Sequence, residues 1–419
     1  MSPTFRSLRN RNYRLFAGGQ VVSLTGSWMQ MVAQGWLALR LTHDSGAALG
    51  IVAALQTLPM LLFGLWGGLI ADRYRKRRVL IGAMAMEGLL ALVLGVLDTT
   101  GVVAYWHVLV LAFLMGLVQV VETPARQAFV IEMVGPDDVP NAVGLNSATF
   151  NIARVFGPVV AGLMVNAIGT GPVFLANGVS FAAVICGLLA MRESELHSVP
   201  VVERGPGQLR EGLRYVKERP ELLLPIILIG VVGTFGFNFA VTLPLLAKQT
   251  FHRDAAAYGV MSAAIAVGAL VGSLLSARRT RPPRQRMLIM LTVLFGALEV
   301  TAGLMPSYLT FLILLVPTGA AVLTLATSCN STVQLGSSPE MRGRVMALYI
   351  LVFMGGTPVG APLIGLAVER FGPRSGLVIG GAVCAAAGVV VLVATLRNRR
   401  LRMVTHLRPR PHVHVVSGV

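Results

Sequence analysis

The stretch GGLIADRYRKRR, Gly67 to Arg78, joins an apolar segment of the chain to a dense cluster of basic residues. A single carboxylate, that of Asp72, stands at the foot of the apolar segment, and five basic residues follow it within six positions. The apolar run is about twenty residues long, enough for a helix to cross a hydrocarbon core of about 30 Å. This order predicts a membrane-spanning helix that ends near Asp72 and a positively charged loop beyond it.

Apolar runs of about this length recur along the whole chain. Of 419 residues, 55% are hydrophobic and only 13% are charged, with a mean hydropathy of +0.73. A soluble domain carries about 25% charged residues. We therefore expect an all-α membrane protein with twelve transmembrane helices in two pseudo-symmetric six-helix bundles. The expected spans are residues 15–40, 46–71, 79–97, 105–124, 141–168, 173–191, 222–247, 255–277, 287–305, 308–330, 343–370 and 374–396.

The distribution of positive charge predicts the orientation. The net charge of +17 could indicate a nucleic-acid partner, but the charge is spread over short clusters between apolar runs. With twelve spans, 29 of the 35 Lys and Arg residues fall on the side of both termini and five on the other side. The positive-inside rule then places both termini in the cytoplasm, and we expect no nucleic-acid binding.

The chain also divides into two similar halves. Residues 192–221 are polar and then amphipathic, which predicts a cytoplasmic linker with a surface helix. We expect bundles at 1–191 and 222–396 and a cytoplasmic tail at 397–419. GPVVAGLMVNAIG, from Gly157, and TPVGAPLIGLAVERFG, from Thr357, place Pro158 and Pro358 at matching mid-span positions. A parallel repeat of six helices is typical of one class of transporters, with a substrate site between the halves.

The loop motif resembles the signature GxLADRxGRK of the major facilitator superfamily. Gly68, Ala71, Asp72 and Arg73 fit it, whereas Arg75 stands where most members have glycine. Residues 74–78 instead fit a DRxxRRR variant found in several bacterial exporters. The stretches Glu122–Pro158, Glu211–Leu222 and Pro339–Tyr349 resemble the branch that contains enterobactin exporters and macrolide efflux pumps. The resemblance implies export by alternating access, driven by exchange with protons, across the bacterial cytoplasmic (inner) membrane.

The resemblance also gives Asp72 a role. In the family this aspartate holds the halves together on the cytoplasmic side, which implies a latch of Asp72 and Arg73 with the start of span eleven near Arg342. Topology alone accounts for most of the remaining basic cluster, because arginine and lysine anchor loops against anionic lipid. It does not account for Asp72, because acidic residues contribute little to orientation.

Arg154 is the one cation expected deep inside a span. Such a charge is expensive, so Arg154 either pairs with a nearby group in a structural role or faces a cavity and contacts substrate. Polar side chains of other spans are expected to line the same amphipathic chamber, together with Trp28, Trp36, Phe235 and Phe239. These polar candidates are Gln30, Gln34, Gln119, Asn146, Asn151, Asn238 and Asn330.

Three carboxylates are candidates for proton coupling. Glu87 and Glu299 lie deepest in apolar spans, where burial favours the protonated carboxyl, although a structural role in a peripheral helix is equally open. Glu122 stands at the expected end of span four, either at the cavity mouth or paired with Arg126.

Small residues and prolines mark expected hinges. Gly157, Pro158 and Gly162 resemble the antiporter motif GPxxGG, and Pro358 is the counterpart in span eleven. Close helix packing and a bend for alternating access are both compatible with this pattern.

These observations favour a monomeric secondary active exporter of a small amphiphilic molecule, siderophore or drug-like, that works by proton antiport. A lysophospholipid flippase is an alternative, and a non-transporting sensor or scaffold is an alternative of another class. No phosphate-binding loop, nucleophile elbow or metal triad is found in the sequence, so we expect no enzyme activity, metal or cofactor. The expected partners are the cargo, protons and membrane lipid.

Overall fold

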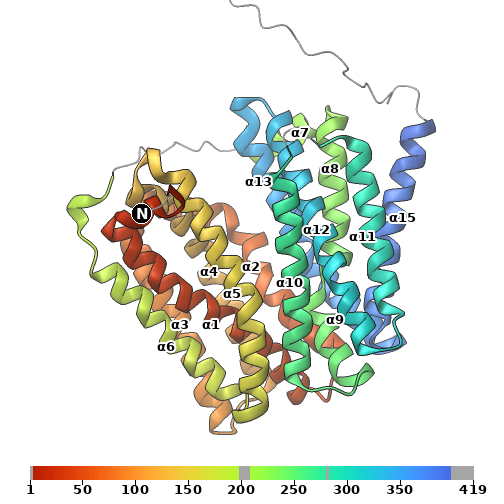
Figure 1. Cartoon of the computed structure of the whole chain (residues 1–419), viewed down its shortest axis with the longest axis horizontal. Helices are drawn as coiled ribbons and strands as arrows, with labels where there is room; N and C mark the ends of the chain where they lie inside the picture. The colour runs from red at the N-terminus through yellow and green to blue at the C-terminus, as the bar shows by residue number, and fades with distance from the viewer. Residues whose placement is uncertain (1–2, 198–207, 280–282, 398–419) are drawn as a thin grey trace, which may run out of the picture.

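The computed structural model describes residues 3–197, 208–279 and 283–397, and the regular secondary structure of this part of the chain is all helical (Figure 1). The helices of the first half are α1 (Arg11–Leu41), α2 (Gly46–Arg73), α3 (Lys76–Thr99), α4 (Tyr105–Val134), α5 (Val139–Ile168) and α6 (Thr170–Leu189). They are followed by α7 (Gln208–Lys217), α8 (Pro220–Val231), α9 (Phe239–Leu245), α10 (Ala255–Ala277), α11 (Gln285–Gly303), α12 (Tyr308–Gly336), α13 (Pro339–Gly355), α14 (Thr357–Phe371) and α15 (Ser375–Arg397).

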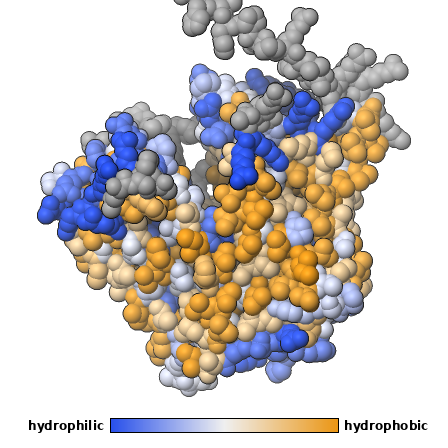
Figure 2. Space-filling model, in the orientation of Figure 1, coloured by the Kyte–Doolittle hydropathy of each residue, from blue (hydrophilic) through white to orange (hydrophobic). Residues whose placement is uncertain are grey.

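Eleven helical segments of the described chain are long and apolar enough to cross a membrane. Figure 2 shows the matching surface, with an apolar belt between two polar ends. The first helix, α1, is not among the eleven, because several glutamines and serines lower the hydropathy of its 31 residues. At 1.5 Å per residue its length, about 46 Å, is nevertheless sufficient for a span. The fold is that of an all-α membrane protein, and the twelfth span remains an expectation.

The helix ends follow local chemistry. Ser45 and Asp254 cap α2 and α10, because their side-chain oxygens accept hydrogen bonds from backbone N–H groups three residues later. At the other ends, Gly169 and Gly372 stop α5 and α14 with φ angles of 88° and 89°, which glycine adopts without strain.

The helices form two groups, α1–α6 and α8–α15, and most of them pack mainly within their own group, whereas α14 packs mainly against α2. In the first group, α1 lies against α5 and α6, and α2 lies against α4. In the second group, α10 lies against α12, and α11 lies against α15. Two helix pairs, α2 with α14 and α5 with α10, form most of the contact between the groups, and we call this contact the seam.

Glycines bring the seam helices together. A Cβ on Gly50 would lie 2.4 Å from the Ala361 carbonyl oxygen, and one on Gly162 would lie 2.5 Å from the Ala255 carbonyl oxygen. Side chains at these positions would hold the backbones apart. Both contacts lie towards the end of the molecule that is opposite the N-terminus and α7, where the two groups converge in Figure 1.

Some expected spans have different bounds. Span four does not end at residue 124, because α4 continues through Pro124 to Val134. Pro124 has no N–H to offer the Val120 carbonyl. At Gly67, the first residue of the GGLIADRYRKRR stretch, α2 packs against that freed oxygen, and a Cβ on Gly67 would lie only 2.0 Å from it.

Spans seven and eleven are interrupted, which the sequence reading did not predict. Between α8 and α9 the chain forms a π-helical turn, η4 (Val232–Gly236), followed by non-helical backbone at Phe237 and Asn238. A second π-helical turn, η5 (Leu246–Thr250), ends span seven. Span eleven is divided at Gly356 into α13 and α14. By contrast, α5 runs unbroken through Pro158.

Candidate functional site

A cavity of about 150 Å³ lies where α1, α5, α9 and α10 meet. It adjoins the seam, because Pro158 lines it and the Pro158 carbonyl also packs against Gly259 of α10. The lining is mostly apolar and aromatic. Its residues are Trp28, Met31, Arg154, Pro158, Phe237, Phe239, Ala240, Leu243, Tyr258, Ser262 and Ile265.

Arg154 supplies the charge of this cavity. It lies about 21 Å from either end of α5, counting 1.5 Å per residue, and is half-buried. Its guanidinium carbon lies 5.6 Å from the centre of the Trp28 ring, in a cation–π contact. Within the described residues, no carboxylate pairs with Arg154 and no hydrogen bond satisfies it. The Arg154 guanidinium therefore lies at mid-helix on the wall of the cavity, in contact with the Trp28 ring.

Trp28 is placed by its neighbours in α5. Gly157 lets α1 approach so closely that a Cβ there would lie 2.6 Å from the Trp28 Cβ. Phe150 meets the Trp28 ring edge to face, with ring centres 5.5 Å apart and planes at 72°. The indole thus contacts Phe150 and Arg154 of α5, while Gly157 lets the base of the Trp28 side chain approach the same helix.

The other polar candidates lie elsewhere. Gln30 accepts a hydrogen bond of 2.6 Å from the Asn177 side chain of α6, inside the first helix group. Gln34 is also buried. Asn151 and Asn238 donate to the backbone carbonyls of Ser147 and Thr234, both at 2.8 Å. Gln119 is exposed, and Asn146 and Asn330 are partly exposed. Among these candidates, the structure brings only Arg154 to the wall of the cavity.

Two of the proton-coupling candidates lie together. Arg126 donates a hydrogen bond of 2.7 Å to Glu122 one turn earlier on α4. Glu87 of α3 is within electrostatic range of both, and both carboxylates are buried. The sequence reading considered Glu122 with Arg126 but did not connect them to Glu87. Arg126 is therefore bonded to Glu122, and Glu87 lies within electrostatic range of this ion pair.

Glu299 lies in a different environment. It is 2% exposed, and its Oε2 has no hydrogen-bond partner in the described chain. Its side chain lies near Gly380 and Gly381 of α15, away from the residues that line the cavity.

The basic loop is anchored by ion pairs within the first group. Lys76 pairs with Glu132 of α4 at 2.7 Å, and Arg75 and Arg77 both pair with Glu193, which follows α6. Of the expected latch, Arg73 is exposed and the Arg342 guanidinium donates to the Gln334 carbonyl of its own half. The side chain of Asp72 lies outside the described residues.

The opposite end of the seam has polar contacts that the sequence reading missed. Ser45 Oγ and the Ala47 N–H, at the start of α2, donate to the Glu369 carboxylate of α14 at 3.0 and 3.1 Å. Lys248 pairs with Asp44 at 2.5 Å. The partners in each contact are far apart in sequence. A serine before the apolar run of α2 indicates a helix cap, but nothing near it in the sequence indicates Glu369 as a partner.

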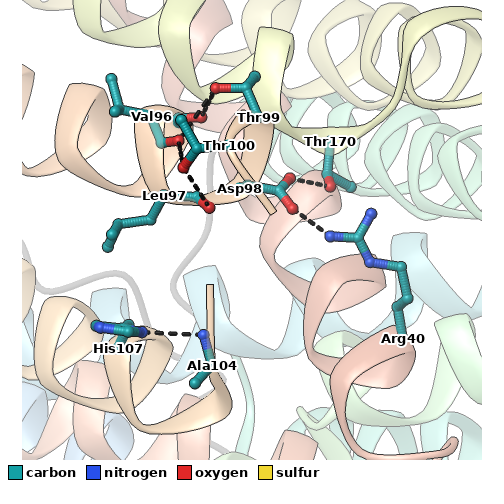
Figure 3. Close-up of polar contacts among 10 residues, drawn as sticks. Arg40, Val96, Leu97, Asp98, Thr99, Thr100, Ala104, His107 and Thr170 are labelled. Atoms are coloured by element: carbon teal, nitrogen blue, oxygen red, sulfur yellow. Dashed lines mark hydrogen bonds and ion pairs between the residues drawn. The ribbon is translucent and has the colours of Figure 1, made fainter. Parts of the chain in front are cut away.

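A second missed cluster lies inside the first group at the same end. Figure 3 shows the Asp98 carboxylate at the end of α3, between Arg40 of α1 and Thr170 of α6. The Asp98 side chain is only 2% exposed, whereas that of Arg40 is 52% exposed. The cluster joins three helices and lies apart from the residues that line the cavity. No group of metal-ligating side chains is found among the described residues.

Comparison with solved structures shows the fold. A bacterial homologue of the human lysosomal transporter Spinster, in an inward-facing and occupied conformation, has a TM-score of 0.72 at 15% identity, covering 94% of this chain and 99% of that one. The nucleoside transporter NupG has a TM-score of 0.71 at 11% identity, covering 93% and 100%.

Comparison with curated proteins finds exporters and transporters. The staphyloferrin A transporter of Staphylococcus aureus is 26% identical over 62% of this chain and 66% of its own length, just under two thirds. Macrolide efflux protein A of Streptococcus pyogenes is 22% identical, over 88% and 92%. The enterobactin exporter EntS of Shigella flexneri is 26% identical, over 80% of each.

The family comparison covers nearly the whole chain. The profile of the family described as transmembrane secretion effectors matches residues 2–416. Together with the helical fold and the relatives, this match shows that the chain belongs to the transmembrane secretion effector family of the major facilitator superfamily, and is a multi-pass membrane transporter, not an enzyme.

Proposed function

We propose that this transporter exports a small amphiphilic molecule by alternating access, in exchange for protons. The observation that carries the proposal is the cavity between α1, α5, α9 and α10, which is mostly apolar, has Arg154 as the one charged residue of its described lining, and adjoins the seam. An apolar pocket with few polar groups suits a partly hydrophobic cargo. The names of the relatives support siderophore-like or drug-like cargoes.

The orientation follows from the charge count, which favours both termini in the cytoplasm. In that orientation the glycine contacts and the Ser45–Glu369 hydrogen bond close the outer end, so this conformation is inward-facing. Alternating access then requires these contacts to separate while the opposite ends of the groups approach. Asp72 and Arg73 would latch onto the start of α13 in the outward-facing state, and the transporter would act as a monomer.

Proton exchange is assigned to the buried pair Glu87 and Glu122. Among the described residues, Arg126 is the one cation that acts on Glu87, and it is already bonded to Glu122, so ionising the two carboxylates together is unfavourable in a low-dielectric site. Such a pair readily holds one proton that can be released when the surroundings change. This supports Glu87 and Glu122 as carriers over Glu299, which has no charged partner among the described residues.

Transport in inside-out membrane vesicles tests the proposal. Cargoes of three kinds would be offered: a carboxylate siderophore, a macrolide, and a fluorescent lysophospholipid. We expect uptake of a siderophore or macrolide when the vesicle interior is acid, and its loss on addition of a protonophore. Lysophospholipid movement independent of pH would favour a flippase instead, and binding of a partner protein without any transport would favour a sensor or scaffold.

A further inference from the structure

The unpaired guanidinium of Arg154 makes the cavity selective for charge. Among the described residues, the cavity wall contains no aspartate or glutamate, so a positively charged cargo would meet only the like charge of Arg154 there. A neutral cargo would leave a mid-membrane cation without a counter-ion, which is costly. An anionic cargo would supply the missing partner. We propose that the cavity binds an acidic amphiphile, with its anionic group on Arg154. This inference rests on the proposed transport function.

The geometry favours a planar oxyanion such as a carboxylate. Arginine presents its N–H groups as a fork that matches two carboxylate oxygens. Trp28 holds the guanidinium by its ring, and Phe150 and Gly157 in turn hold Trp28. The donor is therefore positioned before the cargo arrives, and little side-chain freedom is lost on binding.

The opposite wall of the cavity suits the apolar part of the cargo. Phe237 lies in the break of span seven, Phe239 and Leu243 lie in α9 just after it, and all three belong to the second helix group. Arg154 and Trp28 belong to the first group. An acidic amphiphile would thus contact the first helix group through its charge and the second through its apolar body. Movement of the two groups at the seam would therefore change how tightly the cargo binds.

Binding of a matched series of probes tests this inference. The probes are dansyl-labelled amphiphiles that differ only in a terminal carboxylate, amide or primary amine, added to the purified protein in phosphatidylcholine nanodiscs. We expect the carboxylate to bind about 10- to 100-fold more tightly than the amide, and the amine to bind more weakly than both. Arg154→Gln should reduce the carboxylate to the affinity of the amide and leave the amide nearly unchanged, and Arg154→Lys should retain part of the preference.

The control is Arg278→Gln, which removes the same charge from the exposed end of α10 and should change none of the affinities. A second arm replaces part of the phosphatidylcholine by phosphatidylglycerol. If the anionic lipid competes with the carboxylate probe in the unaltered protein but not in Arg154→Gln, the acidic amphiphile is a lipid. If it does not compete, the ligand is a soluble acid.

The inference is overturned if the amine binds as tightly as the carboxylate, or if Arg154→Gln keeps the carboxylate preference. Transport in vesicles would then still support the export function with a different cargo class. If none of the probes binds to the folded protein and no cargo moves in vesicles, the export function itself fails.

Discussion

Glu369 of α14 accepts a hydrogen bond of 3.0 Å from Ser45, the N-terminal cap of α2. The bond therefore joins the second helix group to the first. The same carboxylate accepts from the Ala47 N–H, so it lies at the positive end of a 28-residue helix. A carboxylate there is favourable by about 0.3 to 1 kcal/mol. This contact joins the two helix groups at one end of the seam, and in the proposed orientation it would have to break for the outer end to open.

Replacing Glu369 with Gln should therefore weaken the closed outer end. The amide keeps one hydrogen bond but loses the charge, so we expect the outward-open population to rise about two- to fivefold. Spin labels on the two helix groups near residues 42 and 372 would measure the separation. Arg370→Gln, an exposed neighbour on the same helix, is the control. An unchanged distance distribution would show that Glu369 does not stabilise the closed end.

Replacing Gly162 with Ala should disturb the other seam pair. The new Cβ would lie 2.5 Å from the Ala255 carbonyl oxygen, so α5 and α10 must separate. Overpacking of this kind costs about 1 to 3 kcal/mol, which corresponds to a five- to 150-fold shift away from the conformation described here. Labelling of an engineered cysteine near the outer end would report the shift.

Gly144→Ala is the matched control, because Gly144 lies on the same helix and has no neighbour within 4 Å of an added Cβ. It should leave labelling and transport unchanged. If both variants behave alike, helix propensity explains the effect of Gly162→Ala, and the close approach of α5 and α10 is not needed for the closed state.

The seam shows what one sequence could predict and what it could not. Apolar length and charge order predicted most helices, and Arg154 stood out because a charge in a long apolar run is rare. The contact between Ser45 and Glu369 joins residues 324 positions apart. Inside the first helix group, the contact between Arg40 and Asp98 joins residues 58 apart. Nothing local in the sequence specifies which helices meet at either place.

Helix orientation was a second source of error. Gln30 was expected to face the cavity, but it bonds to Asn177, because α6 lies against that face of α1. The break at Gly356 was missed because a glycine in an apolar run equally predicts close packing. In fact Gly356 and Gly360 both approach Thr234 of the interrupted span seven.

Replacing Arg40 and replacing Asp98 should lower the stability of the folded protein by different amounts. Removing Arg40 leaves a buried carboxylate with only the Thr170 hydroxyl, whereas Asp98→Asn leaves an arginine that is half-exposed to solvent. Loss of the partner of a buried charge costs about 3 to 5 kcal/mol. We expect Arg40→Gln to lower the melting temperature in detergent clearly more than Asp98→Asn does. Equal effects would mean that Asp98 is solvated in the folded protein.

The position of Glu87 within electrostatic range of the Glu122–Arg126 ion pair gives a prediction about proton coupling. One proton moved down a gradient of one pH unit supports about a tenfold cargo gradient. If the pair carries that proton, Glu87→Gln and Glu122→Gln should each abolish the tenfold accumulation in vesicles. Exchange of cargo down its own gradient should survive, because neither residue lines the cavity. The ratio of accumulation with and without the pH gradient measures this effect.

Glu299→Gln is the comparison variant, since Glu299 is buried alone between α11 and α15. Its amide can replace a protonated carboxyl without loss of charge, so accumulation should remain near tenfold. If Glu299→Gln abolishes accumulation while the other two variants retain it, the proton passes through the second helix group. In that case the Glu87–Glu122–Arg126 cluster only ties α3 to α4.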